Sequence, residues 1–115
     1  MNSLEKVTAA TFGDRVSESD QPVLVEFTTS GCPACHAARP MLERLATEFD
    51  GRARIVEVNV EEEQELGTLF RIRSVPTLAF FKNGAFVDGV VGAPPAGVLR
   101  RKLDQLTSAF CAPRG

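Results

Sequence analysis

Apolar and polar residues follow one another along this chain in blocks that predict alternating strands and helices. Short runs rich in β-branched residues are typical of buried strands, whereas apolar residues spaced three and four positions apart indicate helices with one buried face. The pair Asn83-Gly84 is a favoured two-residue turn between antiparallel strands. The predicted elements are a helix over about 8–17, a strand over 22–28, a helix over 33–49, a strand over 54–60, a helix over 61–71, strands over 77–81 and 85–91, and a closing helix after Pro95.

The ends and apolar faces of the helices agree with this assignment. Pro33 stands at a first helical position, where its missing N–H costs nothing, and Asp50-Gly51 is a typical helix end. The acidic run over 61–63 suits the positive end of the next helix dipole. We expect these side chains of the last two helices to point inward: Leu66, Leu69, Phe70, Leu99, Leu103, Leu106 and Phe110. Alternating strands and helices followed by a hairpin predict an α/β fold with a mixed sheet between helices.

Length and composition limit the classes of protein that fit. The 115 residues, 43% of them apolar, suit one domain over 1–115 with a core of about 7–106. No apolar run approaches the roughly 20 residues that span a bilayer, and a net charge of −2 does not indicate a nucleic-acid partner. The first residues lack a basic region followed by an apolar stretch, so we expect a cytoplasmic protein without a signal peptide. We also expect a monomer.

The pair Cys32 and Cys35 follows the first predicted strand and begins the longest predicted helix. Two cysteines at this spacing can form a disulfide, bind a metal or remain inert thiols. At a helix N-terminus, free N–H groups and the positive dipole end favour the thiolate, which is the reactive form in disulfide exchange. A zinc site needs about four ligands, and only His36 and Cys111 remain as candidates. The pattern therefore favours redox chemistry, and a CxxC pair near a strand–helix–strand pattern is typical of thioredoxin-like proteins.

Further segments, in the same order and spacing, resemble the thioredoxin family from about Val7 to Leu106. They are Val23–Phe27 before the cysteine pair, Pro40 inside the helix, Arg73–Thr77 as a loop with a cis-proline, Phe81–Gly84 as a hairpin turn, and Val91–Ala93 as the last active-site loop. The resemblance implies the thioredoxin fold: a central mixed sheet flanked by helices, with a β-hairpin and a C-terminal helix at the end.

The resemblance also implies an activity, the reduction of protein disulfides by dithiol–disulfide exchange. Cys32 would be the attacking nucleophile, and Cys35 would resolve the mixed disulfide. No bound cofactor or metal is implied. NADPH would supply electrons through a thioredoxin reductase, and disulfide-containing proteins would be the substrates.

The resemblance assigns a second group of residues to substrate binding: Gly31, Pro33, Val75, Pro76 and Gly92. Pro76 is either an ordinary loop proline or, as the family match favours, part of a cis Val75–Pro76 bond. The Val75 backbone would then pair with an extended substrate segment. Gly31 and Thr28 stand where the family commonly has tryptophan, so we expect Cys32 to be open to solvent.

Two glutamates interrupt predicted strands. Glu26 is either an edge-strand residue that faces water or a buried carboxylate whose pKa is raised by desolvation. The family usually has aspartate at this position, which favours the buried reading and proton transfer with Cys35. Glu57 stands where the family often has lysine near the buried acid. It either removes that positive partner or reaches out to solvent.

The residues between the cysteines depart from the usual family motif. Because Pro33 comes first, the N–H groups of Ala34 and Cys35 are both expected to point at the Cys32 sulfur. A proline directly after the first cysteine is more typical of glutaredoxins and some disulfide-forming oxidases. One alternative is therefore a glutathione-coupled or more oxidising oxidoreductase or isomerase. Another is a non-catalytic binding module or metal-cluster carrier. We interpret Cys111 as a bystander thiol.

Overall fold

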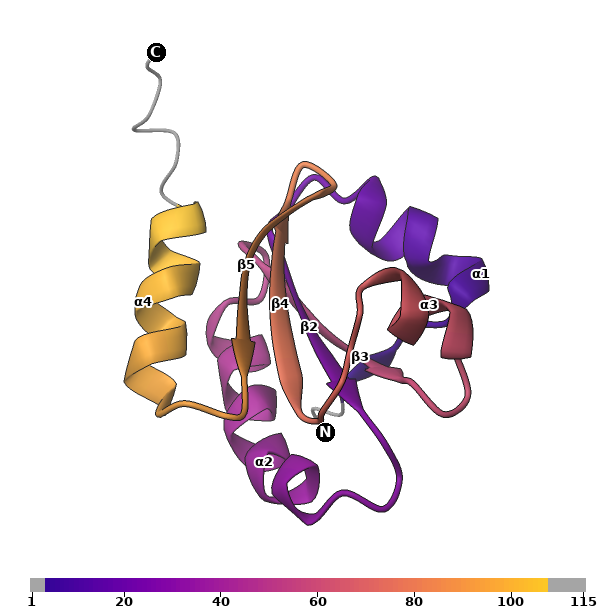
Figure 1. The fold of residues 1–115 in the computed structure, drawn as a ribbon. Coiled ribbons are helices and arrows are strands. Elements are labelled where there is room, and N and C mark those ends of the chain that lie inside the picture. The colour runs from indigo at the N-terminus through magenta and orange to yellow at the C-terminus, as the bar shows by residue number, and fades with distance from the viewer. Residues whose placement is uncertain (1–3, 108–115) are drawn as a thin grey trace.

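A mixed sheet forms the centre of the structure, a computed structural model that describes residues 4–107 (Figure 1). Within these residues the sheet has five strands in the order β1-β3-β2-β4-β5. Their bounds are β1 Glu5–Lys6, β2 Val23–Thr28, β3 Arg54–Asn59, β4 Thr77–Lys82 and β5 Ala85–Val91. β1, β3 and β2 are parallel, whereas β4 is antiparallel to β2 and β5 is antiparallel to β4. The predicted mixed sheet is confirmed.

The short edge strand β1 was not predicted. It has only two residues, so its sequence carries too few positions to show a strand period. Its pairing with β3 is nevertheless regular, and the N–H of Val7 continues it by donating to the Glu57 carbonyl at 2.8 Å. Leu4 and Val7, on either side of the strand, are both buried.

Helices cover both faces of the sheet (Figure 1). One face carries α2 (Pro33–Glu48) and α4 (Ala96–Thr107), and its core includes Leu42, Phe80 and Leu103. The other face carries α1 (Ala9–Phe12) with its π-helical continuation η1 (Gly13–Ser17), together with α3 (Gln64–Leu69). The core of that face includes Val16, Phe27, Val58, Leu66 and Phe81.

Helix α3 is shorter than the predicted helix over 61–71. The side chain of Asn59 accepts hydrogen bonds from the N–H groups of Glu61 (2.8 Å) and Glu62 (3.1 Å), which holds the acidic run in a turn before the helix. Leu66 is buried as predicted. The inward prediction for Leu69 was wrong, because α3 ends there and its side chain is 67% exposed. Phe70 is half-buried.

The hairpin between β4 and β5 is confirmed. Asn83 and Gly84 have positive φ angles of 53° and 81°, as the favoured two-residue hairpin turns require. A side chain at Gly84 would also collide with the backbone oxygen of Ser17, so the turn needs glycine for space as well as for conformation.

In α4, Leu99 and Leu103 are buried and Leu106 packs at the edge of the core. Phe110 and Cys111 lie outside the described residues. Among residues 4–107, no helix has both the length and the apolar character needed to cross a membrane.

Candidate active site

The cysteine pair and the proline loop lie at the same end of the sheet. β2 ends at Thr28, and a short turn leads to Cys32, the N-cap of α2. At the same edge, Thr77 begins β4 and pairs with Phe27 near the end of β2. The peptide preceding Thr77 therefore lies near the start of α2, as Figure 1 shows at the lower edge of the sheet.

Cys32 and Cys35 form a disulfide, with 5.2 Å between their Cα atoms. Pro33 stands at the start of α2 as predicted. The N–H of Cys35 donates to Cys32 Sγ at 3.0 Å, so the first turn of the helix directs a donor at the sulfur. The second predicted donor, the N–H of Ala34, makes no such bond in the described structure. The helix start therefore supplies one donor in this disulfide form.

The expected exposure of Cys32 was wrong. The residue is 7% exposed and Cys35 is 4% exposed, although Gly31 and Pro33 beside them are exposed. The disulfide explains this burial, because it draws the Cys32 sulfur toward Cys35 on the inner face of α2. The absence of tryptophan at Gly31 and Thr28 therefore does not uncover the pair in this state.

The Val75–Pro76 peptide bond is cis, which confirms the prediction. The carbonyl of Pro76 accepts a hydrogen bond from the Gly92 N–H at 2.7 Å. Gly92 has a φ of 95°, a conformation that glycine adopts readily and other residues rarely adopt. The hydrogen bond thus joins two of the loops that were predicted to face substrate.

Glu26 is buried in the middle of the sheet and does not face water from an edge. β2 lies between β3 and β4, and Glu26 is 1% exposed. Its Oε2 atom has no hydrogen-bond partner within the described chain. Desolvation and the charge of Glu57 raise the pKa of Glu26 to about 7, although Arg39 and His36 act in the opposite direction. A carboxyl with this pKa gains and loses a proton near neutral pH.

Glu57 is buried and paired, an arrangement that neither sequence reading anticipated. It lies opposite Glu26 on β3 and is 5% exposed. Arg39 on α2 donates from Nη2 to Glu57 Oε1 at 2.5 Å. Arg39 therefore supplies the positive charge beside the acidic pair, from a helix instead of a strand. The sequence carried one signal that Arg39 lies near the site. It stands four residues after Cys35, and residues at this spacing share a helix face.

A cavity of about 180 Å³ connects Cys35 with this charged group. Its lining includes Cys35, His36, Arg39, Glu57 and Asn59. The exposed His36 ring contacts the Ser30 carbonyl through Nε2 at 2.9 Å, which connects α2 to the turn before Cys32. Polar side chains thus line a path between the surface and the inner cysteine.

The described residues contain no group of three or more His, Cys, Asp or Glu side chains arranged to hold a metal ion. Cys32 and Cys35 are joined to each other, and His36 contacts a backbone oxygen.

Comparisons with known proteins agree with this geometry. The thioredoxin family model matches residues 3–105. Thioredoxin 1 of Nostoc sp. is 38% identical over 105 residues, which cover 91% of this chain and 98% of that protein. Thioredoxin 1 of Synechococcus elongatus is 39% identical with the same coverage. A mutant thioredoxin from Halobacterium salinarum superposes with a TM-score of 0.83, at 30% identity and 92% coverage of each chain.

The comparisons cover nearly all of the described chain and include its cysteine pair. The fold is the thioredoxin fold predicted from the sequence, and the glutaredoxin-like, oxidase and binding-module alternatives are not favoured. The chain therefore belongs to the thioredoxin family, and it is a thiol–disulfide oxidoreductase that reduces protein disulfides through Cys32 and Cys35.

Proposed function

We propose that Cys32 is the attacking nucleophile and Cys35 the resolving thiol. In the reduced enzyme, the Cys32 thiolate attacks one sulfur of a substrate disulfide and the other sulfur leaves as a thiolate. Cys35 then attacks Cys32 in the mixed disulfide, which releases the second substrate thiol and forms the Cys32–Cys35 disulfide. The observation that carries these roles is the Cys35 N–H donor to Cys32 Sγ at the start of α2, a contact that stabilises negative charge on that sulfur.

Glu26 is the proposed proton acceptor for Cys35. Cys35 must lose its thiol proton before it attacks, because the thiolate is the nucleophile. A buried carboxyl with a pKa of about 7 is partly ionised at neutral pH and can take that proton, directly or through water. The cavity lined by Cys35 and by Glu57, the residue opposite Glu26, gives polar surroundings to the Cys35 end of such a transfer. Arg39 limits the rise in the pKa of Glu26, so it is a positioning residue in this scheme.

The proposed substrate-facing residues come from three loops: Gly31, Pro33, Val75, Pro76 and Gly92. Gly31 and Pro33 are exposed on either side of Cys32. The half-buried Val75 offers its backbone to an extended substrate segment, in the manner of strand addition. The Gly92–Pro76 hydrogen bond supports this role because it holds the two loops together.

The electron source in this proposal is NADPH, acting through a thioredoxin reductase, and the enzyme itself carries no bound cofactor. The chain matches relatives named thioredoxin over nearly their full length, and this similarity supports the proposed electron source. We further propose that residues 1–115 act as one monomeric domain in the cytoplasm, on disulfide-containing proteins.

Redox titration of the Cys32–Cys35 pair against defined glutathione ratios tests the direction of the reaction. The reduction potential of the pair should be about −270 mV if the enzyme is a reductase, a value typical of thioredoxin. A strong oxidant would have a potential of about −120 mV. A measured value near the second figure would contradict the proposed role as a reductase.

A further inference from the structure

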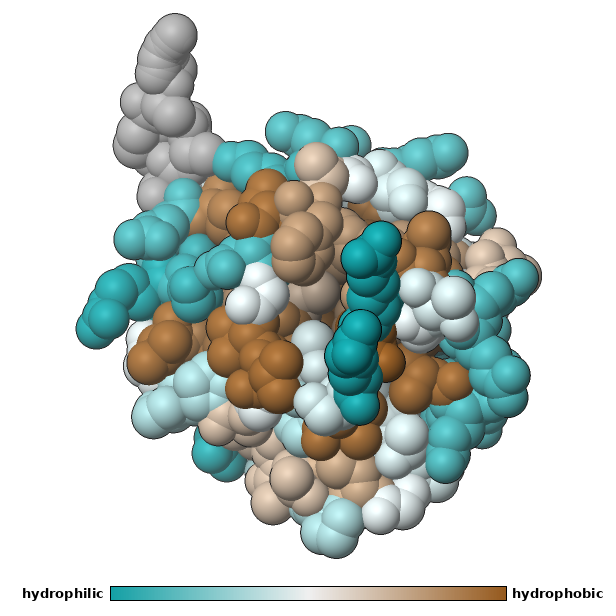
Figure 2. All heavy atoms as spheres, in the orientation of Figure 1, coloured by the Kyte–Doolittle hydropathy of each residue, from teal (hydrophilic) through white to brown (hydrophobic). Residues whose placement is uncertain are grey.

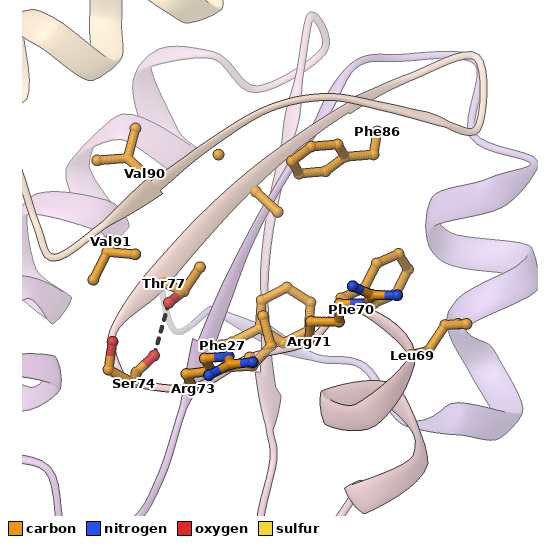
Figure 3. Close-up of a pocket in the computed structure, with 13 residues that line it drawn as sticks. Phe27, Leu69, Phe70, Arg71, Arg73, Ser74, Thr77, Phe86, Val90 and Val91 are labelled. Atoms are coloured by element: carbon orange, nitrogen blue, oxygen red, sulfur yellow. Dashed lines mark hydrogen bonds between the residues drawn. The ribbon is translucent and has the colours of Figure 1, made fainter.

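A groove of about 470 Å³ lies on the sheet face that carries α3, between β5 and the connection from α3 to β4 (Figure 3). Its lining is mainly apolar, and three of its large apolar side chains are exposed. Leu69 is 67% exposed, Phe86 is 56% exposed and Val91 is 72% exposed. Exposed apolar side chains gathered around a hollow are typical of interaction sites.

The groove exists because α3 ends early and because small residues of β4 and β5 form its floor. Helix α3 ends at Leu69, and β5 is largely exposed along its length. Gly89 and Ala79, which pair across β5 and β4, line the groove with small or absent side chains. A Cβ at Gly89 would lie 3.0 Å from Cζ of Phe86, so glycine leaves room beneath that ring.

The rim of the groove is positively charged. Arg71 and Arg73, both exposed, lie on the side opposite Phe86 and Val91 (Figure 3). Neither guanidinium has a carboxylate partner within residues 4–107, and no acidic residue lines the groove. Figure 2 shows this face, with strongly hydrophilic side chains crossing between apolar ones. These two cations thus remain available in a chain whose net charge is −2.

The groove is continuous with the proposed substrate-facing loops. Ser74 and Thr77, which line it, stand on either side of the Val75–Pro76 peptide and are joined by a 2.7 Å hydrogen bond from Thr77 Oγ1 to the Ser74 carbonyl. Val91, another lining residue, directly precedes Gly92. A segment that contacts those loops therefore reaches the groove without crossing another element.

We propose that this groove binds an extended segment of the disulfide-bearing protein substrate, one that carries an apolar side chain flanked by carboxylates. The apolar side chain enters between Phe86 and Leu69, and the carboxylates meet Arg71 and Arg73. This inference rests on the proposed function and names its substrate class. It adds side-chain selectivity to a site whose other substrate contacts are mainly to backbone.

Charge argues against two other occupants. A second copy bound about a two-fold axis would bring its own Arg71 and Arg73 against the same patch, which places like charges together. The parts of this chain outside the described residues, 1–3 and 108–115, contain Arg114 and no acidic side chain. The charge of an acidic segment of another protein complements the rim, whereas the charge of neither other occupant does.

The test compares three peptides, each joined by a mixed disulfide to the same small thiol. The first has leucine flanked by glutamates beside its cysteine, the second has lysines in place of the glutamates, and the third has serine in place of the leucine. Wild-type enzyme should show a kcat/KM about five- to tenfold higher for the first peptide than for the second at low ionic strength. This preference should shrink as salt is added, because exposed charges are screened.

The variant Arg71→Glu/Arg73→Glu should abolish or reverse the preference for the acidic peptide. The matched control is Arg44→Glu/Arg101→Glu, which makes the same change in net charge at exposed arginines on α2 and α4. The control should keep the preference. Leu69→Ser should reduce the discrimination between the leucine and serine peptides by about threefold. Because Leu69 is largely exposed, its replacement should leave the fold intact.

The outcomes separate this inference from the proposed function. Failure of the wild type to reduce any of the three peptides would contradict the proposed function itself. Equal kcat/KM values for the three peptides, or the same change in preference in the rim and control variants, would overturn the groove proposal alone. A preference that survives Arg71→Glu/Arg73→Glu would overturn it as well.

Discussion

Glu26 and Glu57 lie opposite each other on β2 and β3, both buried, and they have different surroundings. Arg39 donates a hydrogen bond to Glu57, whereas Oε2 of Glu26 has no hydrogen-bond partner in the described part of the chain. Burial and the neighbouring Glu57 charge raise the pKa of Glu26 to about 7.

Glu26 should make the protein less stable as pH rises. Its pKa in the folded state is about 7, above the ordinary value of 4.5, so the folded state holds this proton more tightly than the unfolded state. The stabilisation is fully present below about pH 4.5 and is lost as pH rises through about 7. Glu26→Gln should raise the free energy of unfolding at pH 8 by about 2 to 3 kcal/mol, with little change at pH 4.5. Urea unfolding at both pH values measures this effect.

The control for that comparison is Glu65→Gln, because Glu65 is exposed in the first turn of α3. It should change the free energy of unfolding by less than about 0.5 kcal/mol at either pH. An equal gain at pH 4.5 and pH 8 in Glu26→Gln would show that its effect does not come from ionisation.

Glu26→Gln should also slow release of the substrate from the mixed disulfide. Glutamine cannot accept the Cys35 proton, so resolution by Cys35 should fall by about tenfold or more, while attack by Cys32 changes less. Rapid acid quenching followed by mass spectrometry measures the mixed disulfide. No increase in that species, with normal turnover at pH 7, would remove Glu26 from the mechanism.

Arg39→Met should destabilise the protein because it leaves Glu57 buried without its cation. The Arg39 side chain is 36% exposed, so we expect a loss of about 2 kcal/mol, less than for a fully buried pair. The double variant Arg39→Met/Glu57→Gln should recover most of the loss, because no unpaired charge remains. Urea unfolding at pH 7 measures both, with Arg44→Met as a control. A double variant no more stable than Arg39→Met would refute this account.

The two-cysteine mechanism predicts different results for the three cysteines. Cys35→Ser should trap a mixed disulfide through Cys32, because the resolving thiol is gone. Cys111→Ser should retain full reduction of insulin disulfides, because the proposed mechanism gives its thiol no part in the exchange. Loss of turnover in Cys111→Ser would contradict this assignment, as would trapping through any cysteine other than Cys32 in Cys35→Ser.

The sequence predicted the main strands, the four helical regions and the cis Val75–Pro76 bond because their signals are local or belong to a specific motif. It failed where long-range packing decides. β1 is too short to show a period, and Leu69 has the spacing of a buried residue but lies where α3 ends. Burial of Glu26 was favoured by the family resemblance, because the family usually has an acidic residue at this position, whereas the strand pattern alone left an edge position open. Its neighbour Arg39 could not be paired with Glu57, because that contact joins a helix to a strand 18 residues away.

The hydrogen bond between Gly92 and Pro76 affects how broad the substrate specificity of the enzyme can be. It uses one acceptor position of the Pro76 carbonyl, so in the proposed mode of binding a partner beside the disulfide pairs mainly with the backbone of Val75. Two main-chain hydrogen bonds contribute about 1 kcal/mol each, and they are the same for every amino-acid sequence. In the proposed mode of binding, attachment at Val75 would therefore be weak and unselective. Weak binding of this kind favours rapid dissociation of each protein substrate over the formation of a long-lived complex.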